Sequence, residues 1–171
     1  AGGSWIFDSP VNNACAHYLN LALFWAGPSE SESASPTAVT AELARANPIE
    51  SADTTALRVE TAEGVEVVFV ASHACRTLRG PLFRIVCDQG VIETQRGGRV
   101  STAWTVTRPG QAPETRGEAF KPVIPQGVVA RVLNGESRPV GTVQQALAQT
   151  RAVNGAFLSS PIVPIPEGVC D

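Results

Sequence analysis

Three polar side chains, Asn13, His17 and Asn20, interrupt an otherwise apolar run near the start of this 171-residue chain. Histidine is the side chain best placed to exchange protons near neutral pH, and an amide beside it can fix the imidazole tautomer or bind a substrate hydroxyl group. Asparagine cannot ionise. If the three residues form a proton-transfer site, His17 transfers the proton, and Asn13 and Asn20 orient and bind the substrate.

A single helix would bring these three side chains together. The Ser-Pro pair at residues 9–10 is a good helix start, and the Gly-Pro pair at 27–28 ends the apolar run. With about 3.6 residues per turn, all three polar residues project from one narrow face of this predicted helix.

The other faces of this predicted helix are apolar, so we expect it to be largely buried. In a core, each amide or imidazole left without a partner costs about 1–3 kcal/mol. The polar face must therefore meet either a hydrogen-bonded network or a wet cleft. A lone histidine is more often a satisfied structural residue, but three aligned polar groups favour a ligand-binding cleft.

Extended segments follow the polar stretch 29–37. They are rich in β-branched and aromatic residues and span 38–46, 55–61, 65–73, 82–87, 91–94 and 100–107. The connectors "AEG", "DQG" and "RGG" are short and contain glycine, so neighbouring strands should pair antiparallel. The sequence predicts an α+β fold, with one large, open, mostly antiparallel sheet and helices packed on one face.

Two further helices are predicted after the sheet. The first runs from Pro125 to a stop at residues 134–135. The second begins at Thr142, which forms a capping box with Gln145. Its apolar residues fall roughly on one face, as expected for a helix that packs on a sheet: Val143, Ala146, Leu147, Val153 and Phe157.

Charge and hydropathy argue against two classes of partner. Sixteen acidic and thirteen basic residues give a net charge of -3 without a basic cluster, so we expect no nucleic acid partner. The longest apolar run, residues 21–26, is too short to span a bilayer, and the first residues lack signal-peptide features. We therefore expect a cytoplasmic protein that does not bind membranes. The absence of methionine and the start "AGGSW" suggest a fragment.

Metal binding is not expected from the spacing of the candidate ligands. The four cysteines lie far apart in no CxxC motif, which favours reduced thiols over a metal site or disulfides: Cys15, Cys75, Cys87 and Cys170. A metal site would require His17 and His73 to meet a third ligand. We interpret His73 as a core or edge histidine at the end of a strand, and Asp53 as a turn or capping residue.

The order of these segments resembles the carboxy-terminal domain of the Gfo/Idh/MocA oxidoreductases, the family of glucose-fructose oxidoreductase and inositol dehydrogenase. The resemblance covers nearly the whole chain, through "NNACAHYLNLALFWAG", "ADTTALRVETAEGVEVVFVAS" and "QQALAQTRAVNGAFLSS". Members bind NAD or NADP in an amino-terminal Rossmann domain, but this chain has neither a GxGxxG loop nor the Glu-Lys-Pro motif. The resemblance implies that residues 1–171 are a single substrate-binding and oligomerisation domain that binds no cofactor itself.

The same resemblance implies roles for the three polar residues. His17 occupies the position of the family's catalytic histidine, while Asn13 and Asn20 stand where aspartate is common and would bind substrate. The expected activity is NAD(P)-dependent oxidation or reduction of a sugar, polyol or related hydroxyl compound. The fragment alone should be inactive, and it should form a homodimer or homotetramer through its sheet face. The asparagines favour an alternative, a non-catalytic ligand-binding or assembly protein that has kept the fold.

Overall fold

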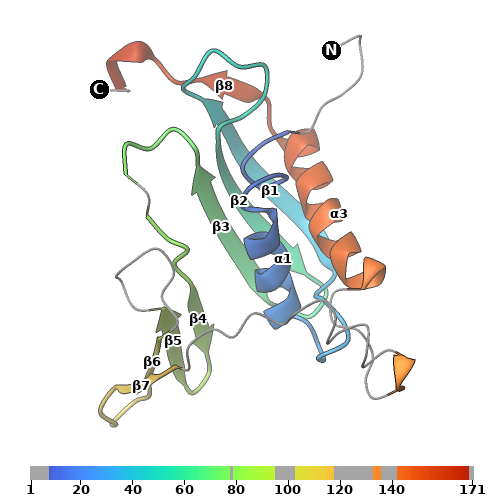
Figure 1. Ribbon diagram of the computed structural model, residues 1–171, viewed down its shortest axis with the longest axis vertical. Helices are drawn as coiled ribbons and strands as arrows, with labels where there is room; N and C mark the ends of the chain where they lie inside the picture. Colours follow the sequence, from blue (N-terminus) through green and yellow to red (C-terminus); the bar gives the residue numbers. More distant parts are fainter. Residues whose placement is uncertain (1–7, 78, 95–102, 118–132, 136–141, 170–171) are drawn as a thin grey trace. The chain divides into compact units, whose positions relative to one another are not determined.

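The computed structural model describes residues 8–77, 79–94, 103–117, 133–135 and 142–169 (Figure 1). The chain divides into two compact units, one made of Ala1–Cys75 with Arg131–Asp171 and the other of Arg76–Ala130. The described residues form two α-helices and two mostly antiparallel sheets, which confirms the predicted α+β class. The single domain stays a prediction.

The larger unit contains a four-stranded sheet in the order β3-β2-β1-β8. Its strands are β1 (Pro36–Arg45), β2 (Thr54–Thr61), β3 (Glu66–Ser72) and β8 (Ile162–Pro164). The first three pair antiparallel, and β8 pairs parallel with β1. The short β2–β3 turn contains Gly64 at φ 74, in the left-handed region that favours glycine. The antiparallel pairing predicted from the "AEG" connector is therefore confirmed.

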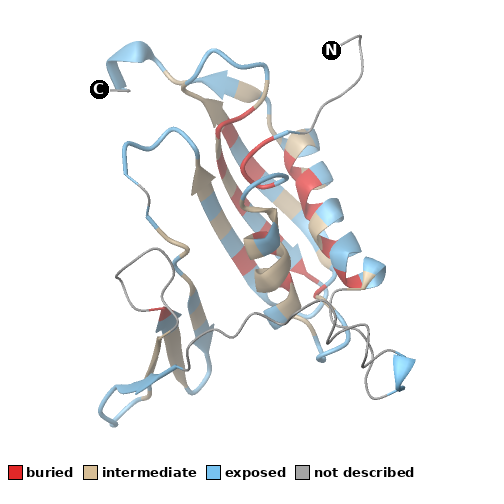
Figure 2. Cartoon of the chain, viewed as in Figure 1, coloured by how far each residue is buried: buried red, intermediate tan, exposed pale blue. Residues whose placement is uncertain are grey.

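Two helices, α1 (Ala16–Trp25) and α3 (Val143–Ser159), lie on one face of this sheet (Figure 1). α3 packs against β1, and α1 packs against α3 and β3. Buried residues gather between the two layers (Figure 2), including Leu19, Leu23, Leu43, Leu57, Val59 and Val153. The prediction that helices cover one face is confirmed for this sheet.

The smaller unit contains a second sheet in the order β4-β5-β6-β7. It is an antiparallel meander of β4 (Arg84–Cys87), β5 (Gly90–Thr94), β6 (Trp104–Thr107) and β7 (Glu114–Arg116). The prediction of one large sheet is therefore wrong. The connection between β3 and β4, residues 73–83, is longer than a hairpin loop, and the meander breaks there.

α1 begins later than its sequence predicts. It starts at Ala16 after the N-cap residue Cys15, whereas residues 9–15 form turns. In these turns the Asn12 amide donates to the Ser9 carbonyl at 3.1 Å, and the Cys15 amide donates to the Pro10 carbonyl at 2.9 Å. Residues 9–11 are buried, so tertiary packing rather than helix propensity sets this conformation.

α3 begins at the predicted capping box but buries a partly different face. The Thr142 hydroxyl accepts from the Gln145 amide at 3.3 Å, and the Gln145 side chain accepts from the Thr142 amide at 2.9 Å. The predicted face is right for Val153, which is buried, and wrong for Val143 and Leu147, which are 81% and 44% exposed. The buried residues are mostly small: Gln145, Ala148, Ala152, Val153 and Ala156. Most of the helix predicted from Pro125 lies outside the described residues.

Candidate ligand-binding pocket

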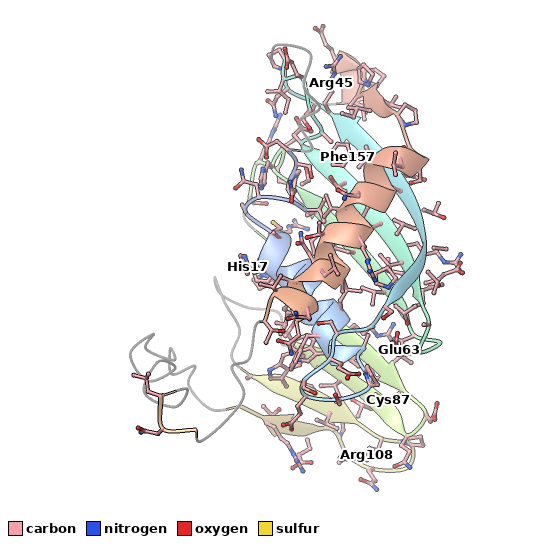
Figure 3. The ribbon with its side chains drawn as sticks, turned by 90° about the vertical axis from the view of Figure 1, so that its right-hand side faces the viewer. His17, Arg45, Glu63, Cys87, Arg108 and Phe157 are labelled. Carbon is pink, nitrogen blue, oxygen red and sulfur yellow. The ribbon has the colours of Figure 1, made fainter. Side chains whose placement is uncertain are left out.

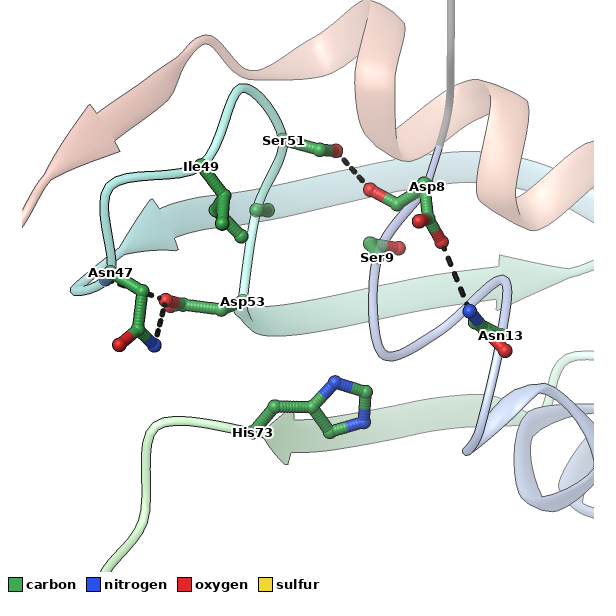
Figure 4. Close-up of a pocket in the computed structure, with 9 residues that line it drawn as sticks. Asp8, Ser9, Asn13, Asn47, Ile49, Ser51, Asp53 and His73 are labelled. Atoms are coloured by element: carbon green, nitrogen blue, oxygen red, sulfur yellow. Dashed lines mark hydrogen bonds between the residues drawn. The ribbon is translucent and has the colours of Figure 1, made fainter.

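A pocket of about 230 Å³ lies in the larger unit, where residues 8–13 meet one end of the sheet (Figure 4). The β1–β2 connection forms a second wall, and the residue that follows β3 forms a third. The lining residues are Asp8, Ser9, Asn13, Asn47, Ile49, Ser51, Ala52, Asp53 and His73. Segments far apart in the sequence thus build one concavity.

Asp53 holds the β1–β2 connection in place. Its carboxylate accepts hydrogen bonds from the Ala46 amide at 3.0 Å and from the Asn47 amide and side chain at 2.8 Å. Burial alone would raise the pKa of Asp53, but these bonds and a weaker one from Thr54 outweigh it and hold the pKa below its usual range. The interpretation of Asp53 as a turn residue is confirmed, and its carboxylate is already occupied.

His73 stands at the end of β3, on the same side of the strand as Val67, Phe69 and Ala71. Its amide donates to the Asp53 carbonyl at 2.8 Å, which ties the end of β3 to the start of β2. In Figure 4 the imidazole lies between the β1–β2 connection and the segment that carries Asn13. Because His73 is exposed, it is not a core histidine, and the edge alternative holds.

The first wall, residues 8–13, is tied to the β1–β2 connection by a hydrogen bond from the Ser51 hydroxyl to the Asp8 carbonyl. Within this wall the Asn13 side chain donates to the Asp8 carboxylate at 3.4 Å. Both contacts are exposed. They fix the direction from which Asn13 reaches the pocket without burying its amide.

Ser9 contributes a polar group that the described protein leaves unused. The residue is 4% exposed and lines the pocket, yet its Oγ atom makes no hydrogen bond within the described residues. A buried hydroxyl without a partner costs about 1–3 kcal/mol. The sequence suggested only a helix start for Ser9, because burial at a turn cannot be read from a Ser-Pro pair.

The structure separates the three predicted site residues. Asn13 precedes α1, so the prediction that it shares a helical face with His17 and Asn20 is wrong. Of these three residues, only Asn13 lines the pocket. His17 is exposed on α1 (Figure 3), with its ring centroid 4.0 Å from that of Tyr18. Asn20 is partly buried, and its Oδ1 atom has no partner among the described residues. The catalytic and substrate-binding roles of these residues stay predictions.

The part of the chain that the structure describes contains no cluster of three His, Cys, Asp or Glu residues that could hold a metal ion. Cys15, Cys75 and Cys87 are free thiols, and burial raises the pKa of Cys15. A raised pKa keeps a thiol protonated and unreactive.

None of the described helices is both long enough and apolar enough to cross a bilayer.

Comparison with known proteins finds no matching family model and no similar curated protein. Solved structures do match. An oxidoreductase from Agrobacterium radiobacter in complex with NAD+, L-tartaric acid and magnesium has a TM-score of 0.64 at 19% identity, over 87% of this chain and 46% of its own. The WlbA dehydrogenase from Bordetella pertussis in complex with NADH and UDP-GlcNAcA has a TM-score of 0.61 at 17% identity, over 88% and 44%.

A third match is the UDP-N-acetylglucosamine 3-dehydrogenase GnnA from Acidithiobacillus ferrooxidans. Its TM-score is 0.62 at 12% identity, over 81% of this chain and 42% of its own. This chain thus has a fold found within these oxidoreductases and dehydrogenases and spans less than half the length of each of these three. The resemblance seen in the sequence is confirmed at the level of the fold.

Proposed function

We propose that this chain is the substrate-binding and oligomerisation domain of an NAD(P)-dependent oxidoreductase that acts on a sugar, polyol or related hydroxyl compound. The fold supports the class, because the three solved structures described above are oxidoreductases or dehydrogenases and are about twice as long as the matched segment. In this proposal a further domain of the whole protein binds the coenzyme and contributes the reacting nicotinamide.

The pocket itself does not fit a dinucleotide. Its lining residues include two carboxylates, Asp8 and Asp53, but no lysine or arginine that could pair with a diphosphate. Nor does the sequence contain the glycine-rich loop that places a diphosphate at a helix N-terminus. We therefore assign the pocket to the substrate and derive no coenzyme contact from this chain.

The observation that carries the proposal is the set of uncharged hydrogen-bonding groups around the pocket. Ser9 and Asn13 offer a hydroxyl and an amide, and His73 offers an imidazole. Each of these groups can both donate and accept, as a substrate hydroxyl also does. A few such groups around a concave site are what specific recognition of a small polar molecule requires.

The exposed face of the sheet supports the oligomerisation part of the proposal. Val68 and Val70 on β3 are 66% and 69% exposed, on the side opposite the helices. The neighbouring ion pair between Arg58 and Glu66, at 2.6 Å, lies at the same surface. Exposed β-branched residues beside a charged pair suit an interface with a second copy of this chain, as a homodimer or homotetramer.

A non-catalytic ligand-binding protein is the second candidate. It is favoured because position 13 is an asparagine, where aspartate is common in the family that the sequence resembles, and because His17 lies outside the lining residues. Such a protein would bind the ligand through the same hydrogen bonds without turning it over.

Turnover by the whole protein separates the two candidates. Sugars and polyols are incubated with NAD+ or NADP+, and reduced coenzyme is followed by its absorbance. We expect coenzyme reduction with at least one substrate, and Asn13→Ala should raise KM more than it lowers kcat. Saturable sugar binding without coenzyme reduction would favour the non-catalytic candidate.

A further inference from the structure

We propose that the pocket selects uncharged polyhydroxy ligands over their carboxylate counterparts, with Ser9 and His73 as ligand contacts. This inference deepens the proposed function and rests on it for the role of the pocket as the substrate site. It adds the charge preference of the ligand and two contact residues that the sequence did not assign.

The Ser9 hydroxyl is the first contact. Ser9 lines the pocket and is 4% exposed, and its Oγ atom makes no hydrogen bond with the described protein. The two backbone carbonyl groups next to it already accept hydrogen bonds: the Ser9 carbonyl accepts from the Asn12 amide, and the Asp8 carbonyl accepts from the Ser51 hydroxyl. A ligand hydroxyl in the pocket would give this side chain the partner that it lacks.

His73 is the second contact. Its backbone is held by the 2.8 Å hydrogen bond to the Asp53 carbonyl, so the position from which the side chain projects is fixed. The imidazole lines the pocket (Figure 4). In its neutral form it offers one donor and one acceptor, and either can pair with a ligand hydroxyl group.

The charges of the lining disfavour an anion. Asp53 is held in its charged form by donors from Ala46 and Asn47, and Asp8 adds an exposed carboxylate, while the lining contains no lysine or arginine. A ligand carboxylate would thus meet negative charge without a cation to pair with. Like-charge juxtaposition is an effective way to reject a wrong ligand.

Ligand binding to the 171-residue chain, without coenzyme, tests the inference. Chemical-shift titrations would use three uncharged probes, D-glucose, D-glucitol and myo-inositol, and two acids, D-gluconate and D-glucuronate. We expect saturable binding of at least one uncharged probe at millimolar concentrations, with the acids bound about tenfold more weakly. Equal or tighter binding of an acid would overturn the charge preference, and so would the absence of binding by every uncharged probe.

Variants test the contacts. Ser9→Ala and His73→Gln should each weaken binding of the uncharged probe about tenfold. Ser33→Ala is the matched control, because Ser33 Oγ is also buried without a partner among the described residues but does not line the pocket. If Ser9→Ala bound as tightly as Ser33→Ala, or if His73→Gln bound like the unmodified chain, that contact would be refuted. Turnover is not measured here, so a failure of the oxidoreductase proposal would be seen separately.

Discussion

Replacing Asp53 with asparagine should destabilise the larger unit, because this side chain joins the β1–β2 connection to the sheet. The carboxylate accepts from the Ala46 amide at 3.0 Å and from two Asn47 donors at 2.8 Å. In Asp53→Asn one oxygen remains, and the new NH2 group faces a donor. Hydrogen bonds to a charged group contribute about 1.5–3 kcal/mol each.

The exposure of the partners decides where in that range the loss falls. Asn47 is exposed, so its donors can turn to water, whereas Ala46 is partly buried and its amide has less access to solvent. We therefore expect Asp53→Asn to lower the free energy of unfolding by about 2 kcal/mol, as for a single lost charged hydrogen bond. In a chain of this size that corresponds to a fall in Tm of about 4–8 °C.

The loss should depend on pH. The folded-state pKa of Asp53 lies below its usual value, so its contribution is complete above the unfolded-state pKa of about 3.9 and is lost as the pH falls through the folded-state pKa. Thermal unfolding by circular dichroism at pH 7 and pH 2 measures the difference between unmodified chain and variant. That difference should be larger at pH 7 than at pH 2.

Glu42→Gln supplies the control, because Glu42 is exposed on β1 in the same unit and the substitution also removes one negative charge. It should change the free energy of unfolding by less than about 0.5 kcal/mol. If Asp53→Asn were as stable as Glu42→Gln at pH 7, or if its deficit persisted unchanged at pH 2, the hydrogen bonds of Asp53 would not be stabilising the fold.

Three shorter predictions concern the helices and the exposed sheet face. Thr142→Ala removes the capping box of α3 and should cost about 1 kcal/mol in chemical denaturation. Val68→Lys should shift the chain from oligomer to monomer in analytical ultracentrifugation, because it places a charge on the proposed interface. In the whole protein, His17→Ala should lower kcat about 100- to 10,000-fold if His17 acts as a general acid or base, and unchanged kinetics would refute that role.

The strands were predictable because their sequence signal is local. Alternating residues in β2 and β3 place Leu57, Val59 and Val67 on the buried side, and a glycine turn joins the two strands. β7 was not predicted. Its residues, Glu114–Arg116, are all exposed, and the strand is defined by its pairing with β6 rather than by an apolar pattern. A polar edge strand leaves no such signal.

The pocket was predictable only in part. The polar character of Asn13 pointed toward a ligand site, but helical geometry grouped it with His17, whereas the turns before α1 place it in the same pocket as His73. Residues 13 and 73 belong to different segments, and no local pattern relates them. Ser9 could not be recognised from the sequence either, since only the folded chain shows that its hydroxyl is buried without a partner.

Gly155 shows why the packing face of α3 could not be read from the apolar pattern. A Cβ atom at this position would lie 2.8 Å from Cγ2 and 3.0 Å from Cβ of Val39 on β1. Both distances are shorter than carbon–carbon contacts at their optimum of about 3.5–4.0 Å. α3 therefore approaches β1 through glycine and alanine, and the larger Val143 and Leu147 are left exposed.

Gly155→Ala consequently sets two effects against each other. Alanine is favoured over glycine inside a helix by about 1 kcal/mol, whereas overpacking a close contact costs about 1–3 kcal/mol. Because valine has a stiff, branched side chain, we expect the steric cost to prevail and the free energy of unfolding to fall. Val39→Ala removes the 2.8 Å contact with Cγ2 but keeps the 3.0 Å contact with Cβ, so in this background the same Gly155→Ala substitution should be less destabilising than in the unmodified chain. Chemical denaturation of the four chains measures this difference, and a Gly155→Ala effect that is the same in both backgrounds would disprove the contact.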